Sequence, residues 1–118
     1  MVSGPLLVYK NKCVSLPASA FELYRHPRTA FGITKKGTWI FFVVDGRFSN
    51  ISEGMNLYEM AYFAKISGYS DFINLDGGGS TTLWIKDQGA TGVMNNPCDN
   101  HKYDHKGERK VSNIVYIK

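Results

Sequence analysis

The stretch from Asp76 to Thr82 carries the residues best suited to chemistry. A carboxylate is followed by three glycines and then by three hydroxyl residues. Glycine lets a ligand approach the main chain closely, and successive exposed N–H groups can bind an anion. We therefore take Asp76 as a candidate reactive carboxylate. The residues expected to bind an anion beside it are Gly77, Gly78, Gly79, Ser80 and Thr81.

Two other interpretations of this segment stay open. A Gly-Ser linker has a similar composition, although strands are expected on both sides of the glycines. An ordinary turn with a structural aspartate would also fit. A Walker A loop is excluded because no Gly-Lys-Ser/Thr follows the glycines.

A second candidate, Asp45-Gly46-Arg47, follows directly on the most apolar run of the chain. Asp45 adds a second carboxylate. The guanidinium of Arg47 offers a planar fork that can bind a phosphate through two hydrogen bonds. Because Asp-Gly is also common in turns, a turn with a solvated arginine is the alternative.

A third candidate is His26-Pro27-Arg28-Thr29. His26 is suited to carrying a proton or donating a hydrogen bond, and Arg28 to a second anion contact. Thr29 adds a hydroxyl. Pro27 restricts the residue before it to an extended conformation. The other interpretation of His26 is a structural or solvated histidine.

Residues 95–110 are polar, and long polar loops are often binding loops. Asn95 and Arg109 are the candidates there for ligand contacts, although a mobile surface loop fits equally well. Cys98 would need a nearby base to act as a nucleophile. His101 and His105 lack an evident third ligand, so we expect neither a metal nor another cofactor.

The surrounding pattern predicts the elements that hold these residues. A helix begins at the N-cap Asn56, with Glu59 in the capping-box position, and ends near Gly68. Its apolar residues fall on one face: Leu57, Met60, Ala61 and Ala64. Strands are expected over residues 6–9, 13–14, 29–34, 38–44, 72–75, 81–85 and 111–117, and a helical turn near 18–23. The continuous apolar run at 38–44 predicts burial on both faces.

These elements predict an α+β fold, with a mixed, mostly antiparallel β-sheet and one main helix packed on it. The length of 118 residues predicts a single domain over 1–118. Hydrophobic residues make up 43% and charged residues 20%, which argues against disorder.

Charge and hydropathy limit the classes of partner and the locations that we expect for this protein. The net charge of +4 suits a small anionic ligand, but dense basic runs are missing, so no nucleic-acid polymer is expected. No apolar stretch approaches the ~18 residues of a membrane span. The start Met1-Val2-Ser3 shows no signal peptide, and the two cysteines form no disulfide framework. A cytoplasmic location is expected, or a secreted or lysosomal one for an excised domain.

Together the motifs resemble the phosphodiester glycosidase family. The resemblance covers nearly the whole chain and depends most on two motifs in combination. These are His26-Pro27-Arg28-Thr29-Ala30 and Asp76-Gly77-Gly78-Gly79-Ser80-Thr81-Thr82. Family members usually carry further strands before the Gly4-Pro5 segment. Their absence would expose a sheet edge, which predicts a homodimer or higher homo-oligomer.

The resemblance implies hydrolysis of a sugar-1-phosphodiester at the glycosidic carbon. Arg28 and Arg47 would then hold the phosphate, with help from the main-chain N–H groups of residues 77–80. Asp76 and Asp45 would lie near the anomeric carbon, one as base or nucleophile and the other as acid or orienting group. Asp76 is expected to be the more essential of the two.

Two rival functions remain open. A non-catalytic binder could sequester a phosphodiester, including a cyclic or ADP-ribose-type nucleotide. A nucleotide phosphodiesterase would cut a P–O bond instead of the glycosidic bond.

Overall fold

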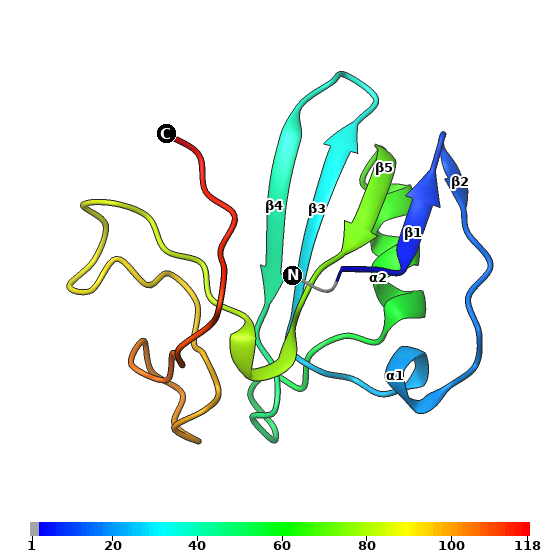
Figure 1. Ribbon diagram of the computed structural model, residues 1–118. Coiled ribbons are helices and arrows are strands. Elements are labelled where there is room, and N and C mark those ends of the chain that lie inside the picture. Colours follow the sequence, from blue (N-terminus) through cyan, green and yellow to red (C-terminus); the bar gives the residue numbers. More distant parts are fainter. Residues whose placement is uncertain (1–2) are drawn as a thin grey trace.

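Five strands form one antiparallel sheet in the order β2-β1-β5-β3-β4. A computed structural model describes residues 3–118 (Figure 1), so Met1 and Val2, on which the judgement about a signal peptide partly depends, lie outside the described residues. The strands are β1 (Leu6–Tyr9), β2 (Lys12–Cys13), β3 (Arg28–Thr34), β4 (Trp39–Val44) and β5 (Tyr69–Asn74). The helices are α1 (Ala20–Leu23), α2 (Leu57–Ile66) and the 3₁₀ turn η1 (Gly78–Ser80). The predicted α+β class is confirmed.

Two tight hairpins set the register of the sheet. Lys10 and Asn11 both have positive φ, at 46° and 66°, as expected for a two-residue turn that matches strand twist. The turn at residues 35–37 joins β3 to β4, and Phe31 then lies opposite Phe41. The sequence predicts turns at Lys10-Asn11-Lys12 and at Lys35-Lys36-Gly37, and the structure confirms both.

Helix α2 covers one face of the sheet. A capping box sets where the helix begins, and its apolar stripe faces the sheet. The side chain of Asn56 accepts a hydrogen bond from the N–H of Glu59 at 2.8 Å, and the Glu59 carboxylate accepts one from Asn56 N–H at 2.9 Å. The predicted apolar stripe is buried against β1, β3 and β5. The buried cluster comprises Leu7, Val8, Ala30, Leu57, Met60, Ala61, Ala64, Tyr69 and Phe72.

The prediction that β4 is buried on both faces is wrong. Ile40 and Phe42 pack against the buried cluster, but Trp39 remains 68% exposed. Strand β4 lies at the edge of the sheet, and no described helix covers its second face. An apolar run therefore indicated strand formation here without indicating a second covering layer.

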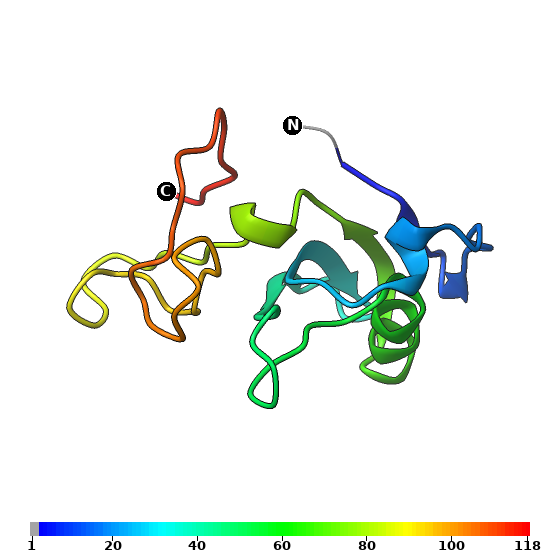
Figure 2. The same cartoon turned by 90° about the horizontal axis from the view of Figure 1, so that it is seen from below.

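The predicted strands at 81–85 and 111–117 are also wrong. After η1 the described chain forms neither a strand nor a helix, and only an isolated bridge joins Trp84 to Val93. Residues 111–117 are exposed. Figure 2 shows 81–118 beyond the β4 edge of the sheet, opposite the end occupied by β1 and β2. Strand-forming residues need a partner strand to hydrogen-bond with, and beyond the single Trp84–Val93 bridge this segment pairs with no strand in residues 3–118.

Among the described residues, no helix combines the length and the apolar character that crossing a membrane requires.

Candidate functional site

One end of the sheet collects three of the predicted motifs. Because β3 is antiparallel to both β4 and β5, its first residue lies beside the last residues of those two strands. The segments there enclose a cavity of about 310 Å³. Its lining comprises Gly4, Phe21, His26, Arg28, Arg47, Leu75, Asp76, Gly77 and Gly78. The structure thus brings together two predicted arginines, a histidine, a carboxylate and part of the glycine bend.

Arg28 is the most firmly held of these groups, with only 2% of its surface exposed. Its Nε donates to the Met55 carbonyl at 3.1 Å, and its Nη2 donates to the carbonyls of Phe21 at 2.7 Å and Tyr24 at 3.1 Å. The guanidinium also lies 4.9 Å from the centre of the Phe21 ring. Among the described residues Nη1 has no hydrogen-bond partner, so it remains available for an anion.

Burial lowers the pKa of Arg28, and the charge of Arg47 adds to that effect, while Glu22 opposes it. The guanidinium of Arg28 nevertheless stays protonated at neutral pH. The cavity therefore contains the fixed positive charge of Arg28. Its three hydrogen-bond partners are main-chain carbonyls, which do not neutralise this charge.

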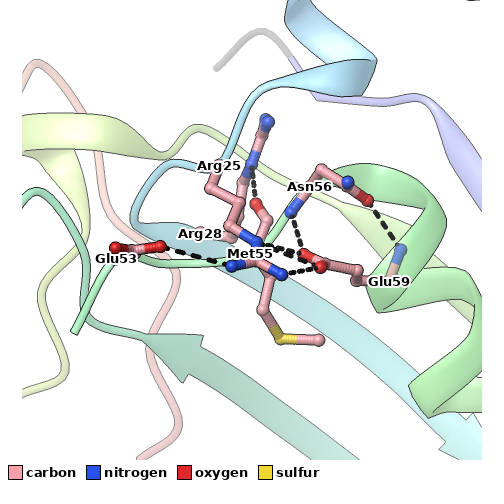
Figure 3. Close-up of polar contacts among 6 residues, drawn as sticks. All are labelled: Arg25, Arg28, Glu53, Met55, Asn56 and Glu59. Carbon is pink, nitrogen blue, oxygen red and sulfur yellow. Dashed lines mark hydrogen bonds and ion pairs between the residues drawn. The ribbon is translucent and has the colours of Figure 1, made fainter.

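The segment before α2 positions Arg28 (Figure 3). Met55 offers its carbonyl to Arg28 and also pairs with His26 in an antiparallel bridge. Arg25 lies across the same segment and forms ion pairs with Glu53, at 3.3 Å, and with Glu59. Glu59 raises the pKa of Arg25, and Arg25 lowers that of Glu59.

Arg47 reaches the cavity from the Asp45-Gly46-Arg47 segment that follows β4, and fewer contacts hold its side chain than hold that of Arg28. It is exposed, its φ is 65°, and its Nη1 lies 3.9 Å from Cys98 Sγ. Gly78 packs beneath it, with φ of 59°, and a Cβ there would lie 3.0 Å from Arg47 Nη2. Glycine at this position therefore serves both the backbone conformation and the close approach of the guanidinium.

His26 lines the cavity in its neutral form. Burial lowers its pKa from the ordinary 6.5, and the positive charges of Arg28 and Arg47 lower it further. A neutral imidazole can accept or donate a proton. An anion bound between the arginines would oppose their effect and raise this pKa again.

The glycine bend offers fewer free N–H groups than the sequence suggested. Gly78 N–H donates to the Pro27 carbonyl at 2.8 Å, and Ser80 N–H donates to the Gly77 carbonyl at 3.1 Å. The amides of Gly77 and Gly79 have no such partner in the described chain. Gly79 is buried, and a Cβ on it would overlap the Asp99 carboxylate.

Asp45 does not line this cavity. Its carboxylate accepts hydrogen bonds from Asn96 N–H at 3.0 Å, Asn96 Nδ2 at 2.9 Å and Asn95 Nδ2 at 3.1 Å. Asn95 in turn donates to the Thr81 carbonyl at 3.0 Å. The structure therefore places Asp45 and Asn95 in a network that fastens the polar loop to the end of β4.

The remaining predicted residues lie beside the cavity. The hydroxyl of Thr29 is 3.3 Å from that of Thr81, which is buried. Arg109 donates to Ser80 Oγ through Nε at 3.2 Å and Nη2 at 2.6 Å. Thr29, Ser80 and Arg109 line a second, larger cavity of about 1,140 Å³, which shares Leu75 and Asp76 with the first.

Sequence reasoning missed Phe21 and Met55, which orient Arg28. Neither has chemistry of its own: one acts through a carbonyl and a ring, the other through a carbonyl. The charge of Arg28 was the only signal, because a buried guanidinium must find acceptors somewhere in the chain. Within residues 3–118, no group of three or more His, Cys, Asp or Glu side chains is arranged to hold a metal ion.

Comparison with known proteins agrees with the resemblance of the motifs. The family model for phosphodiester glycosidase matches residues 1–118. The chain therefore belongs to the phosphodiester glycosidase family.

The curated relatives include the N-acetylglucosamine-1-phosphodiester alpha-N-acetylglucosaminidases of mouse and human, each 35% identical. The mouse match covers 84% of this chain but 18% of the relative, and the human match 76% and 16%. The chain thus spans less than a fifth of the length of these relatives.

Solved structures give the same picture. The catalytic domain of the zebrafish enzyme of that name, auto-inhibited by its pro-peptide, is 29% identical with a TM-score of 0.62. That match covers 78% of this chain and 33% of the zebrafish chain. A hypothetical protein from Synechocystis is 30% identical with a TM-score of 0.56, over 67% of this chain and 15% of that one.

Proposed function

We propose that this protein hydrolyses the glycosidic bond of a sugar-1-phosphodiester. The observation that carries the proposal is the shared cavity of Arg28, Arg47 and Asp76. Two guanidinium groups suit a phosphate diester, and a carboxylate beside them suits the reacting sugar carbon. The names of the mouse and human relatives supply the substrate class, a sugar joined through phosphate to a second group.

The leaving group determines what the residues must do. A phosphate monoester departs readily, so its departure does not require strong protonation by the protein. Arg28 Nη1 and Arg47, with the free amide of Gly77, would stabilise the charge that develops on the departing phosphate. Asp76 would activate water or attack the anomeric carbon, and neutral His26 would carry the proton.

A specific observation favours a second candidate, a protein that retains its ligand intact. Most glycosidases use two carboxyl groups at the reacting carbon. Here Asp76 is the only carboxylate among the described residues that line the smaller cavity, because Asp45 is engaged by Asn95 and Asn96. A pocket with two arginines and one carboxylate can bind a phosphodiester without cleaving it.

The deciding experiment uses the methyl diester of N-acetylglucosamine α-1-phosphate in ¹⁸O-water. Mass spectrometry after denaturation reads where the label goes. We expect label in the sugar and unlabelled methyl phosphate. Label in a phosphate product would show cleavage of a P–O bond, and intact ligand released from the denatured protein would show sequestration.

Two aspartate variants test whether turnover depends on the cavity. Asp76→Asn should abolish turnover and leave the fold intact. Asp87→Asn is the matched control, since Asp87 is an exposed aspartate of the hairpin around Gly89. Full turnover by Asp76→Asn would contradict the assigned role.

A further inference from the structure

The smaller cavity has an apolar side chain that the proposed reaction does not use. Two of the residues that line this cavity, Leu75 and Asp76, also line the larger one. Among the described residues that line only the smaller cavity, Phe21 alone has an apolar side chain. The others are Gly4, His26, Arg28, Arg47, Gly77 and Gly78. Phe21 is therefore the apolar contact that this part of the cavity offers a ligand.

The main chain and the ring of Phe21 are both held in place. A capping box starts α1, with the Glu22 carboxylate accepting a hydrogen bond from Ser19 N–H at 3.2 Å. The Phe21 carbonyl accepts from Arg28 Nη2 at 2.7 Å, and the buried guanidinium lies 4.9 Å from the ring centre. The residue is nevertheless 49% exposed. A ring that is already fixed loses little conformational entropy when a ligand packs against it.

A phosphodiester carries two groups, and the proposed function gives a place to only one of them. With the phosphate between the two arginines and the sugar carbon beside Asp76, the sugar lies on the side that the two cavities share. Phosphorus is tetrahedral, so the second ester oxygen points away from the first. The group on that oxygen then meets the part of the lining to which Phe21 belongs.

We propose that Phe21 contacts the second group of the diester, and that the protein selects diesters in which this group is a ring with an apolar face. The inference rests on the proposed function. An aryl ring or the C–H face of a sugar ring can pack against a phenyl ring, and aromatic contacts stabilise a complex beyond the area that they bury. A methyl group has no such face and gains little from Phe21.

The test compares dimethyl phosphate, benzyl methyl phosphate and cyclohexylmethyl methyl phosphate as ligands. None of them contains a glycosidic bond, so titration measures binding without turnover. NMR chemical-shift titration of the wild-type chain should give roughly 3–10-fold tighter binding of the ring esters than of dimethyl phosphate. Tighter binding of the benzyl ester than of the cyclohexylmethyl ester would support an aromatic second group. Equal binding of these two would support a ring that presents C–H groups, as a sugar does.

Two variants of α1 show whether Phe21 causes the preference. Phe21→Ala should reduce it to less than about 2-fold. The ratio of affinities is the readout because a change in how Arg28 holds the phosphate affects all of the esters alike. Leu23→Ala is the matched control, since Leu23 is an apolar residue of the same helix, is 47% exposed and does not line the cavity. It should keep the full preference.

Circular dichroism establishes that each variant is folded, and Phe21→Leu, which also lacks a flat face, replaces Phe21→Ala if the smaller side chain prevents folding. Equal affinities of the wild-type chain for all of the esters would overturn the role of Phe21 and leave the proposed function standing. A preference that the Phe21 variant retains would overturn it in the same way. If the wild-type chain bound none of the esters, the phosphodiester site itself would be contradicted, and this inference with it.

Discussion

The sheet with α2 and the segment 81–118 are ordered by different forces. The first region combines strand ladders with a closed apolar cluster in which Phe72 is 1% exposed. The second has neither a ladder nor such a cluster, and side-chain hydrogen bonds to Asp45 and Ser80 fasten it. The smaller cavity is lined by residues that precede this segment, and the segment reaches it only through the contact of Cys98 with Arg47.

This difference shows how the two arginines acquire unlike roles. Arg28 begins a strand of the first region and is fixed by three carbonyls. Arg47 contacts Cys98 in the second region and is exposed. A rigid charge and an adaptable charge therefore face the same space, which suits a ligand whose charge moves during reaction.

The largest effect should come from the apolar cluster. Phe72→Ala should lower the free energy of unfolding by about 3–5 kcal/mol, because it leaves a cavity beneath α2. Tyr103→Ala, in the second region, should change it by less than about 1 kcal/mol, since that ring is 49% exposed. Urea unfolding measures both values. Equal losses would contradict the contrast between the two regions.

Substituting lysine for each arginine separates structure from binding. Lysine cannot make the forked contacts of a guanidinium. Arg28→Lys should therefore reduce stability and weaken phosphodiester binding by about 1.5–3 kcal/mol, or roughly 10–150-fold. Arg47→Lys should weaken binding and leave stability unchanged. Calorimetric titration and thermal unfolding test this, and a stability loss in Arg47→Lys would show that Arg47 is structural.

Asp45→Ala should loosen the second region alone. Losing hydrogen bonds to a charged acceptor costs about 1.5–3 kcal/mol. Here the loss should make local opening of residues 95–98 easier, because Asn95 and Asn96 donate to Asp45. Amide hydrogen exchange should accelerate there while β3 and β5 stay protected, and Asp87→Ala should change neither. Unchanged exchange at 95–98 would show that Asp45 does not fasten the loop.

Acid should act on the site through His26. Because its pKa is lowered in the folded protein, the unfolded chain binds more protons once the pH falls below about 6.5. Its contribution to stability therefore begins to fall as the pH drops below about 6.5 and is fully lost below the pKa of the folded protein. Proton NMR should show a pKa below 6.5 in the free protein and a higher one with bound phosphodiester. A pKa that ligand leaves unmoved would separate His26 from the anion site.

The smallest effect should follow Arg25→Ala. Exposed ion pairs contribute about 0–1 kcal/mol, so stability should fall by no more than that. The pKa of Glu59 should rise toward its ordinary value because Arg25 is what lowers it most. Carboxyl-carbon NMR titration reads this directly. A larger loss would mean that the contact, rather than the carbonyl of Met55, organises the segment before α2.

The sequence predicted the elements whose signals are local. The capping box at Asn56 and Glu59, the turn after Tyr9 and the apolar stripe of α2 each depend on residues a few positions apart. The resemblance to the family also implied that Arg28, Arg47 and Asp76 act on one phosphodiester, and all three line the smaller cavity. The engagement of Asp45 by Asn95 and Asn96 joins residues about fifty positions apart, and no local pattern carries it. The apolar segments 81–85 and 111–117 failed as strands because periodicity does not say whether a partner strand is present.

The central claim is that Arg28, Arg47 and the glycine bend bind one esterified phosphate beside Asp76. A crystal structure of Asp76→Asn soaked with the methyl diester of N-acetylglucosamine α-1-phosphate tests it most directly. The phosphate should lie between Arg28 Nη1 and the Arg47 guanidinium, with the anomeric carbon next to residue 76. A phosphate bound elsewhere on the protein, with this cavity holding only water, would contradict the account.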